Sequence, residues 1–414
     1  MLHSCLFSYR CARILNALTL VTFTMLLPGA MFAHPQTLPA PARLEQSAEQ
    51  FSLFVPIASR PRTPLGIIVQ PAELQPARAQ YEQRIEPGRS ALKSLFTNAN
   101  EALATTPCAV AAYTTSTGYD CLNQSSEDAY LLALAYRLTG NPTYSQKGAE
   151  FIRVWSRTLT GISAAEDQPN LDWSRLVPAM IWGADLLTGA PGWGEDDRLA
   201  LIAMLRTHAL PQAKAAATRK NNWADAGNVL WLSIAVYANL PAERAAAVRS
   251  WKLKLDGEHP IGNAATQDAC ADTDWVYGMC RDGSLTEENR RGLDGLSYNQ
   301  GALSMKTVFA EIMRRQGDGS LYSYTTPRGV GLKNGWDFLA PKTIDAFAKQ
   351  CTWPYSTNHC VNTANRSGWE IAYAYWHAPA YLPVLAEHRP YGWSNWADPG
   401  YSTAVFSSRN LSGN

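Results

Sequence analysis

A long series of helical segments separated by short breakers constrains this 414-residue chain most. Apolar residues recur at i, i+3 and i+4 spacing in nine segments, with breakers such as Gly140-Asn141-Pro142 and Gly317-Asp318-Gly319 between them. Short turns between successive helices predict antiparallel helix pairs, and hence an all-α fold, a single (α/α) toroid or a solenoid. The segments expected to be helical are Glu127–Leu138, Pro142–Thr158, Leu171–Leu187, Asp196–Leu210, Ala224–Leu240, Ala242–Leu255, Ser297–Arg315, Pro341–Gln350 and Gly368–His377.

The pattern of these helices favours a toroid. The sequence has no exact repeat period, which argues against a regular helical-repeat solenoid. The segments Leu131–Leu138 and Val229–Ala238 are apolar nearly all round, as expected of inner helices that are walled by protein on every side. Concentric helix layers leave a concave end where loops converge, and we expect a cleft for a polymer there.

The N-terminus has the pattern of a secretory signal peptide. Two arginines precede an apolar run over about residues 14–27, and small residues follow up to Ala33. The run is shorter than the roughly 20 residues that a membrane-spanning helix needs. We therefore predict a signal peptide over residues 1–33; because Met31 fits the cleavage pattern poorly, cleavage elsewhere and a retained anchor stay open.

Composition divides the remainder of the chain into three parts. Residues 34–84 begin with a stretch rich in Pro, Gln and Ala that has few helical stripes, which predicts an extended N-terminal arm. Residues 85–390 hold the predicted helices and form one catalytic domain. Residues 391–414 are assigned to a C-terminal tail.

Removal of the signal peptide leaves six of the eight cysteines, in three neighbouring couples. Six cysteines allow fifteen connectivities, but the short polar loops within the couples favour local pairing. Zinc is the rival, although none of the couples has CxxC spacing. Local disulfides indicate an oxidising compartment, either the periplasm or the exterior. The predicted pairs are Cys108 with Cys121, Cys270 with Cys280, and Cys351 with Cys360.

Charge and aromatic content narrow the function class. Lys and Arg total 36 against 35 for Asp and Glu, so the chain lacks the basic excess of a nonspecific nucleic-acid binder. Its 14 Trp and 18 Tyr, against 11 Phe, are suited to a sugar-binding cleft because these rings carry a polar group. A large helical core would use the same residues, and composition does not decide between the two.

Two polar segments stand at the edges of otherwise apolar helices. The first is Lys220-Asn221-Asn222-Trp223, directly before the helix expected from Ala224; Asn222, taken alone, is most simply the N-cap of that helix. The second runs from Asp282 to Gln300. Within it, Arg291 and Tyr298 are seven residues apart, about two turns, so a continuous helix would put them on one face.

Together the two segments resemble the alginate lyase family of (α/α)-toroid polysaccharide lyases. Members carry Asn-Asn-His at the start of an inner helix, then a DGSL-like turn, an Arg, and a Tyr seven residues further on. The corresponding elements in this chain are Asn221-Asn222-Trp223, Asp282–Leu285, Arg291 and Tyr298. The resemblance extends in the right order over roughly residues 127–377.

The resemblance implies cleavage of a 4-linked uronate polymer, alginate (polymannuronate) or glucuronan, by β-elimination. Tyr298 would act as base and then acid, Arg291 would lower the pKa of Tyr298 and help hold charge, and Asn222 would neutralise the substrate carboxylate. Neither metal nor cofactor is required. We expect a monomer that acts on an acidic polysaccharide, without a nucleic-acid partner or membrane attachment. Further substrate contacts are expected from Lys220, Asn221, Trp223, Arg290 and Asn299.

This chain departs from the family motif at Trp223, which stands where members have His. With Tyr298 acting from one face of the sugar, elimination should be syn, which fits mannuronate or glucuronate better than guluronate. His359, beside Cys360, is one candidate to replace the missing histidine. An insertion around Cys270–Cys280 lengthens the gap between the two motifs and is expected to shape the cleft rim.

Two other functions remain open at this stage. An inverting glycosidase on the same toroid requires two carboxylates about 6.5–9.5 Å apart. A noncatalytic binder of uronate polymers would fit the loss of the motif histidine. The carboxylates available to a glycosidase are Asp172, Asp225, Glu288 and Asp294.

Overall fold

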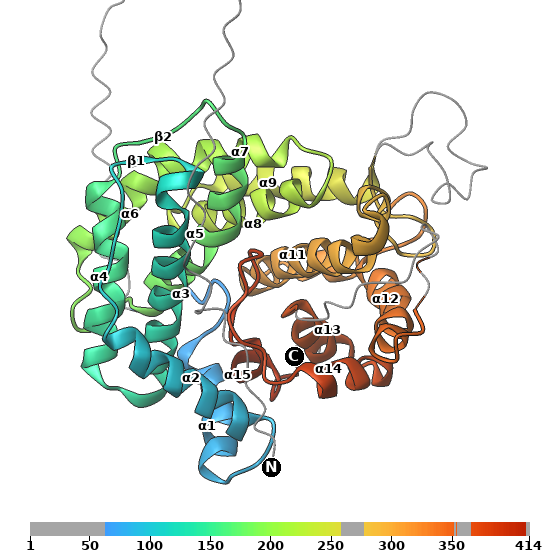
Figure 1. The fold of residues 1–414 in the computed structure, drawn as a ribbon, viewed down its shortest axis with the longest axis horizontal. Coiled ribbons are helices and arrows are strands. Elements are labelled where there is room, and N and C mark those ends of the chain that lie inside the picture. Colours follow the sequence, from blue (N-terminus) through green and yellow to red (C-terminus); the bar gives the residue numbers. More distant parts are fainter. Residues whose placement is uncertain (1–62, 258–276, 352, 354–365, 411–414) are drawn as a thin grey trace, which may run out of the picture. The chain divides into compact units, whose positions relative to one another are not determined.

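The computed structural model describes residues 63–257, 277–351, 353 and 366–410, and this part of the chain is built almost entirely of helices (Figure 1). Its two short strands, β1 Ala112–Tyr113 and β2 Gly161–Ile162, pair in parallel. The helices are η1 Pro71–Leu74, α1 Gln75–Glu82, α2 Gly88–Leu103, α3 Thr115–Thr139, α4 Pro142–Thr158, α5 Gln168–Leu186, α6 Glu195–Met204, η2 Leu205–Ala209, α7 Leu210–Ala217, α8 Asn222–Tyr237, α9 Pro241–Asp256, α10 Thr286–Asn289, η3 Gly292–Asp294, α11 Gly295–Arg315, η4 Ser320–Tyr322, α12 Leu332–Phe347, α13 Gly368–Trp376, η5 Pro379–Tyr381, α14 Leu382–His388 and α15 Ser402–Phe406. None of the helices in these ranges is long and apolar enough to cross a membrane.

The helices form the (α/α) toroid that the sequence predicts. Helices α3, α5, α8, α11 and α13 contact one another in that order, and α4, α9 and α12 each pack against the inner helix that precedes them in the chain (Figure 1). Most residues of α5, α8 and α11 are buried, because these inner helices have protein on both sides.

Most of the tryptophans belong to the core and therefore do not mark a sugar site. Seven of them are less than 2% exposed, and Trp155 and Trp173 pack edge to face with each other and beside Tyr113. The aromatic composition is thus explained largely by packing. The seven are Trp155, Trp173, Trp182, Trp251, Trp336, Trp353 and Trp369.

Helix boundaries differ from the prediction where proline lies within a helix. The predicted segment Pro341–Gln350 is the second half of α12, which begins at Leu332 and contains Pro341. Sequence analysis placed this proline in the first turn, the usual position for proline in a helix. Likewise, the segment predicted to end at Leu210 continues into α7 through the π-helical turn η2.

The described residues of the predicted arm and tail pack against the helices of the fold. The backbone N–H groups of Leu65, Gly66 and Ile67 donate to the buried carboxylate of Asp185 at 2.6, 2.8 and 2.9 Å. Residues 67–69 are buried, and η1, α1 and α2 follow at once. Apolar side chains and a carboxylate acceptor therefore fix a segment whose composition resembles a linker. The predicted signal peptide lies outside the described residues.

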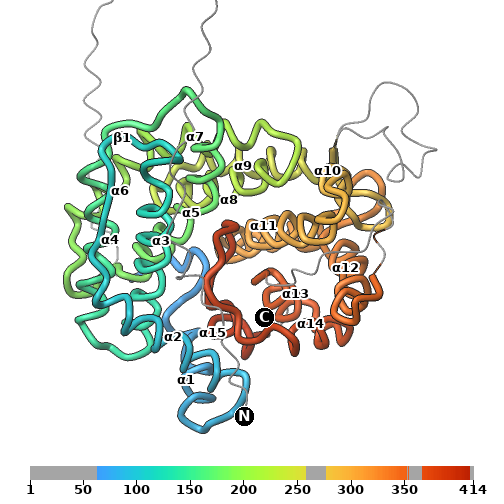
Figure 2. Tube along the Cα trace, viewed as in Figure 1, coloured from blue at the N-terminus to red at the C-terminus, as the bar shows by residue number. Residues whose placement is uncertain are grey.

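The C-terminal segment likewise ends inside the fold. Figure 2 follows this segment past the inner helices to α15, which contacts α2 and α13. Val405 and Phe406 are fully buried there. Contact with α2 joins the last helix to an early one, which closes the ring of helices.

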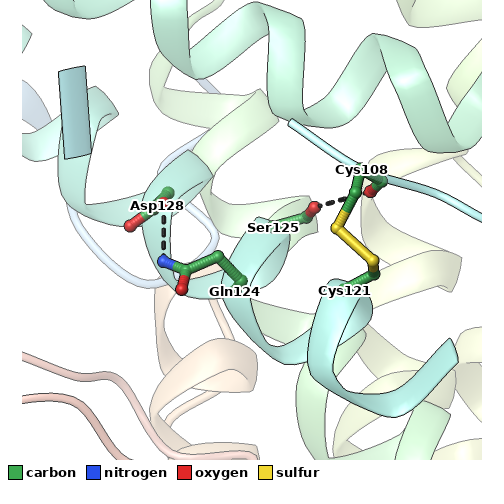
Figure 3. The surroundings of a disulfide bond; sticks show 5 residues. All are labelled: Cys108, Cys121, Gln124, Ser125 and Asp128. Atoms are coloured by element: carbon green, nitrogen blue, oxygen red, sulfur yellow. Dashed lines mark hydrogen bonds between the residues drawn. A yellow bond between two sulfur atoms is a disulfide. The ribbon is translucent and has the colours of Figure 1, made fainter. Parts of the chain in front are cut away.

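Four of the six cysteines in the predicted pairs are described, and all four are disulfide-bonded. Cys108 pairs with Cys121, as predicted, with 5.5 Å between the Cα atoms (Figure 3). This bridge fastens the segment before β1 to α3, where Ser125 also donates a hydrogen bond to the carbonyl of Cys108 at 3.2 Å. Cys280 and Cys351 are disulfide-bonded as well. Their predicted partners, Cys270 and Cys360, lie outside the described residues.

Candidate active site

The first polar segment forms the start of inner helix α8. Asn221 is the N-cap, and its side-chain oxygen accepts a hydrogen bond from the backbone N–H of Trp223 at 3.2 Å. Asn222 is therefore the first helical residue, and the N-cap interpretation of Asn222 is wrong. Its side chain is 4% exposed, and its Oδ1 accepts no hydrogen bond in the described structure. Because Asn221 caps the helix, the side-chain amide of Asn222 is left available for a ligand.

The second polar segment is fastened to α11 by Asn299. The Asn299 Oδ1 accepts from the backbone N–H of Leu285 at 2.7 Å, and its Nδ2 donates to Asn289 Oδ1 at 3.0 Å and to the Gly295 carbonyl at 2.9 Å. Gly283 makes the preceding turn at φ +95°, where a Cβ would lie 2.3 Å from the Asn334 carbonyl oxygen. Since the Asn299 side chain is 1% exposed and bonded internally, the structure favours a positioning role for it over substrate contact.

Arg291 and Tyr298 lie together, although no continuous helix joins them. The short helix η3 separates Arg291 from the first turn of α11, which carries Tyr298. The guanidinium carbon of Arg291 lies 4.8 Å from the centroid of the Tyr298 ring. The Arg291 side chain is 35% exposed and Tyr298 is half-buried, so solvent reaches both. Arg290 points elsewhere and forms an ion pair with Glu287.

Glu288 connects Arg291 to the start of α8. It is 2% exposed; its Oε1 accepts the backbone N–H of Asn222 at 2.6 Å, and its Oε2 lies 3.5 Å from Arg291 Nε. Burial, with a smaller contribution from Asp225, raises the pKa of Glu288 to about 8 against the opposing effects of Arg291, the Asn222 N–H and Lys306. One carboxyl group thus joins two of the three residues expected to be catalytic.

A second buried carboxylate supports the same region. Asp225, on the first turn of α8, forms an ion pair with Lys306 of α11 at 2.5 Å. Burial raises the pKa of Asp225 although Lys306 opposes it. A cavity of about 10 Å³, space for about one water molecule, lies beside this pair and is bordered by Lys220, Lys254 and Glu288 among others. No group of three potential metal ligands occurs among the residues that the structure describes.

The other expected contacts lie around the start of α8. Trp223 is half-buried, and the guanidinium of Arg219 lies 5.1 Å from the centroid of its ring. Lys220 is exposed, with its Nζ 5.9 Å from the ring centroid of Tyr277. His359, the candidate to replace the motif histidine, lies outside the described residues.

Sequence analysis missed a group of aromatic and cationic residues beside Tyr298. The ring of Trp396 packs edge-on against Tyr298 with the centroids 5.6 Å apart. The guanidinium carbons of Arg366 and Arg175 lie 4.4 and 5.7 Å from the Trp396 ring. Trp396 was missed because residues 391–414 were assigned to a tail. The aromatic density of that stretch, with Tyr391, Trp393, Trp396, Tyr401 and Phe406, is the signal that would have revealed it.

The carboxylates that a glycosidase would use are arranged for other tasks. Asp172 accepts hydrogen bonds from the side chains of Tyr113, Thr115 and Gln168 at 2.7–3.0 Å. Asp225 is held by Lys306, and Asp294 is exposed. Glu288 is buried, and its Oε1 accepts the backbone N–H of Asn222.

Fold and site define an (α/α)-toroid protein that carries Asn222 and Tyr298 at the starts of two inner helices, with Arg291 just before the second of them. The alginate lyase family model matches residues 113–347, more than half of the chain, and the chain therefore belongs to the alginate lyase family. It is accordingly a polysaccharide lyase. No curated protein sequence matches the chain.

Solved alginate lyases share the fold. An alginate lyase from Bacteroides ovatus is similar with a TM-score of 0.54 and 16% identity over 81% of this chain and 97% of that chain. Alginate lyase A1-III complexed with tetrasaccharide gives a TM-score of 0.53 and 14% identity, covering 74% and 85%. Alginate lyase A1-III from Sphingomonas species A1 gives 0.53 and 14%, covering 69% and 76%.

Proposed function

We propose that the protein cleaves a 4-linked uronate polymer by β-elimination, with Tyr298, Arg291 and Asn222 as its catalytic residues. The observation that carries this proposal is the position of the Arg291 guanidinium over the Tyr298 ring, with Asn222 joined to Arg291 through Glu288. These three residues come from two segments that lie far apart in the sequence, and Glu288 links the backbone of Asn222 to Arg291. A lyase requires a proton acceptor beside groups that hold negative charge, and Tyr298 with Arg291 supplies such a pair.

The elimination needs no redox partner. Tyr298, as the phenolate, takes the proton from C5 of the uronate, and negative charge spreads from C5 onto the conjugated carboxylate. The Arg291 cation and the Asn222 amide stabilise this charge where it develops. The bond between C4 and the glycosidic oxygen then breaks as the C4–C5 double bond forms. The Tyr298 phenol returns its proton to the departing oxygen, which restores the enzyme.

The substrate that we propose is a polymannuronate or a glucuronan. Tyr298 is the single proton-transfer group of the proposed set, because Trp223 occupies the place of the motif histidine. One group acting on one face removes the proton and protonates the leaving oxygen on the same side. This syn geometry fits mannuronate or glucuronate, whereas guluronate would need a second group on the opposite face.

The test is to incubate the purified protein with mannuronate and guluronate blocks of alginate and with glucuronan, and to follow the absorbance of the conjugated double bond. We expect a rise with a mannuronate or glucuronate polymer that Tyr298→Phe lowers by at least about 10²-fold. Tyr375→Phe is a matched control, since Tyr375 is half-buried and stacks on Tyr322 with the ring centroids 3.8 Å apart. New reducing ends without absorbance would instead indicate hydrolysis, and binding without turnover a binding protein.

We also propose that the protein works outside the cytoplasm, in the periplasm or after secretion. Cys108, Cys121, Cys280 and Cys351 are all disulfide-bonded, and disulfides persist in oxidising compartments. Fractionation of cells that express the full chain, followed by immunoblotting, tests this. Protein confined to the cytoplasmic fraction with free thiols would contradict it.

A further inference from the structure

Glu288 occupies a place between the catalytic elements that the proposed mechanism does not use. It lies on the short helix α10, 66 positions from Asn222 in the sequence, and yet its Oε1 accepts the backbone N–H of Asn222 at 2.6 Å. Its Oε2 accepts no hydrogen bond in the described structure and faces Arg291 Nε at 3.5 Å. The Glu288 side chain therefore lies between the start of α8 and Arg291 and contacts both.

The groups around Glu288 have opposing effects on its pKa, which lies near 8, so that both the acid and the carboxylate form are accessible near neutral pH. Arg291 and Lys306 favour the carboxylate, while burial and Asp225 favour the protonated acid, and burial dominates. Lys220, Lys254 and Glu287 border the same cavity. Because Oε1 already accepts the Asn222 N–H, the proton of the neutral acid belongs on Oε2, the atom that faces Arg291.

We propose that Glu288 is a positioning residue of the lyase site, which holds Asn222 and Arg291 in register and, when it ionises, reduces the positive charge that Arg291 offers to the substrate. When Glu288 is the neutral acid, it does not offset the positive charge of the Arg291 guanidinium, which lies over the Tyr298 ring. In the carboxylate form, the ion pair with Glu288 competes with the uronate carboxylate for the same cation. This inference rests on the proposed function, since the charge matters through Arg291 and Tyr298.

The substitution that isolates the charge is Glu288→Gln, because an amide retains the acceptor for Asn222 and cannot ionise. Glu287→Gln is the matched control: Glu287 borders the same cavity but forms its ion pair with Arg290. Both variants and the parent protein are assayed for kcat and KM from about pH 6 to pH 10, a range that brackets the Glu288 pKa of about 8.

We expect kcat/KM of the parent protein to fall above about pH 8, mainly through a rise in KM. In Glu288→Gln this decrease in kcat/KM should begin at a pH about one unit or more higher than in the parent. Glu287→Gln keeps the parent profile. A Glu288→Gln profile that superimposes on the parent, or a uniform loss at all pH values, would overturn the proposal.

A spectroscopic measurement separates this inference from the function itself. Infrared difference spectra between about pH 6 and pH 10 should show a buried carboxylic acid that ionises near pH 8 in the parent and is missing in Glu288→Gln. This signal does not depend on turnover. If the acid titrates as expected but no polymer yields unsaturated product, the proposed function fails; if product forms but no such acid titrates, the role of Glu288 fails.

Discussion

The two ends of inner helix α11 hold charged groups in opposite ways. At its C-terminal end, Glu311 is fully buried and accepts hydrogen bonds from Arg314, Arg315 and Tyr322 at 2.8–3.1 Å. Glu73 of η1 pairs with Arg315 at 2.8 Å and also with Arg409 at 2.7 Å. These partners come from the beginning, middle and end of the described chain, so this cluster joins the ends of the fold.

At its N-terminal end, the same helix leaves polar groups with unused capacity. Tyr298 is half-buried, Arg291 is 35% exposed, and neither Asn222 Oδ1 nor Glu288 Oε2 accepts a hydrogen bond in the described structure. Unpaired buried polar atoms cost stability, so a fold tolerates them where another requirement outweighs that cost. The comparison teaches that the carboxylates of the structural cluster are paired with arginines, whereas two acceptor atoms of the candidate active site, Asn222 Oδ1 and Glu288 Oε2, remain unused.

The largest effect is expected from Glu311→Gln at the saturated end. Replacing this carboxylate leaves the buried cation of Arg315 with fewer partners, which should lower the free energy of unfolding by about 3–5 kcal/mol. Urea unfolding measures this, with the exposed Glu387→Gln as control. The kcat per folded molecule should not change. A loss of kcat in fully folded protein would break the comparison.

Arg291→Ala, at the N-terminal end, should lower activity and leave stability nearly unchanged, the reverse of Glu311→Gln. Removing the cation beside Tyr298 should lower kcat/KM by about 10²–10³-fold, while thermal stability changes little because Arg291 is partly exposed. Arg290→Ala should cost much less activity, since Arg290 pairs with Glu287. Equal losses in the two variants would mean that the stacking of Arg291 on Tyr298 does not identify the catalytic arginine.

Asn299→Ala sharpens the comparison, because Asn299 lies at the catalytic end but is saturated. Its loss removes the acceptor for Leu285 N–H and the donors to Asn289 and Gly295, at a cost of about 1–3 kcal/mol in unfolding free energy. Unfolding and KM are measured on the same preparation. A raised KM with unchanged stability would return Asn299 to the role of substrate contact that the sequence suggested.

The helical part of the fold was predictable because its signals are local. Apolar periodicity and breakers located most inner helices, and α4 was predicted with its exact bounds, helped by Asn141 and Pro142 at its start. The packing of the N-terminal and C-terminal segments was not predicted, for a different reason. Residues 65–67 and α15 are fixed by long-range contacts, such as the hydrogen bonds to Asp185, which leave no periodic pattern in a short stretch.

The family pattern selected Asn222, Arg291 and Tyr298 without any knowledge of the short helix η3 between the last two. The structure places Arg291 beside Tyr298, and the catalytic roles of the three residues stay a prediction. The pattern did not reveal Trp396, which reaches Tyr298 from nearly a hundred residues away in the sequence. Nor did spacing distinguish Asn299 from a ligand contact, because saturation depends on Leu285, Asn289 and Gly295 in three dimensions.

The smallest effect concerns the pH dependence of the saturated cluster. Burial tends to raise the pKa of Glu73, but Arg315, Arg409 and the Gln70 N–H outweigh it, so the pKa lies below the ordinary value of 4.5. The unfolded chain then binds more protons between the two pKa values, and the contribution of Glu73 to stability, complete above about pH 4.5, is lost as the pH falls through its folded pKa. The free energy of unfolding, measured at a series of pH values from neutral to acid, should therefore decrease more steeply with falling pH in the parent protein than in Glu73→Gln, which has no such carboxylate to protonate.

The pKa values of Glu73 and Glu288 are shifted in opposite directions. Acid should therefore weaken the structural cluster while Glu288 stays protonated, and alkali should affect the candidate active site first. Identical pH slopes for the parent protein and Glu73→Gln would show that Arg315 and Arg409 do not hold Glu73 ionised.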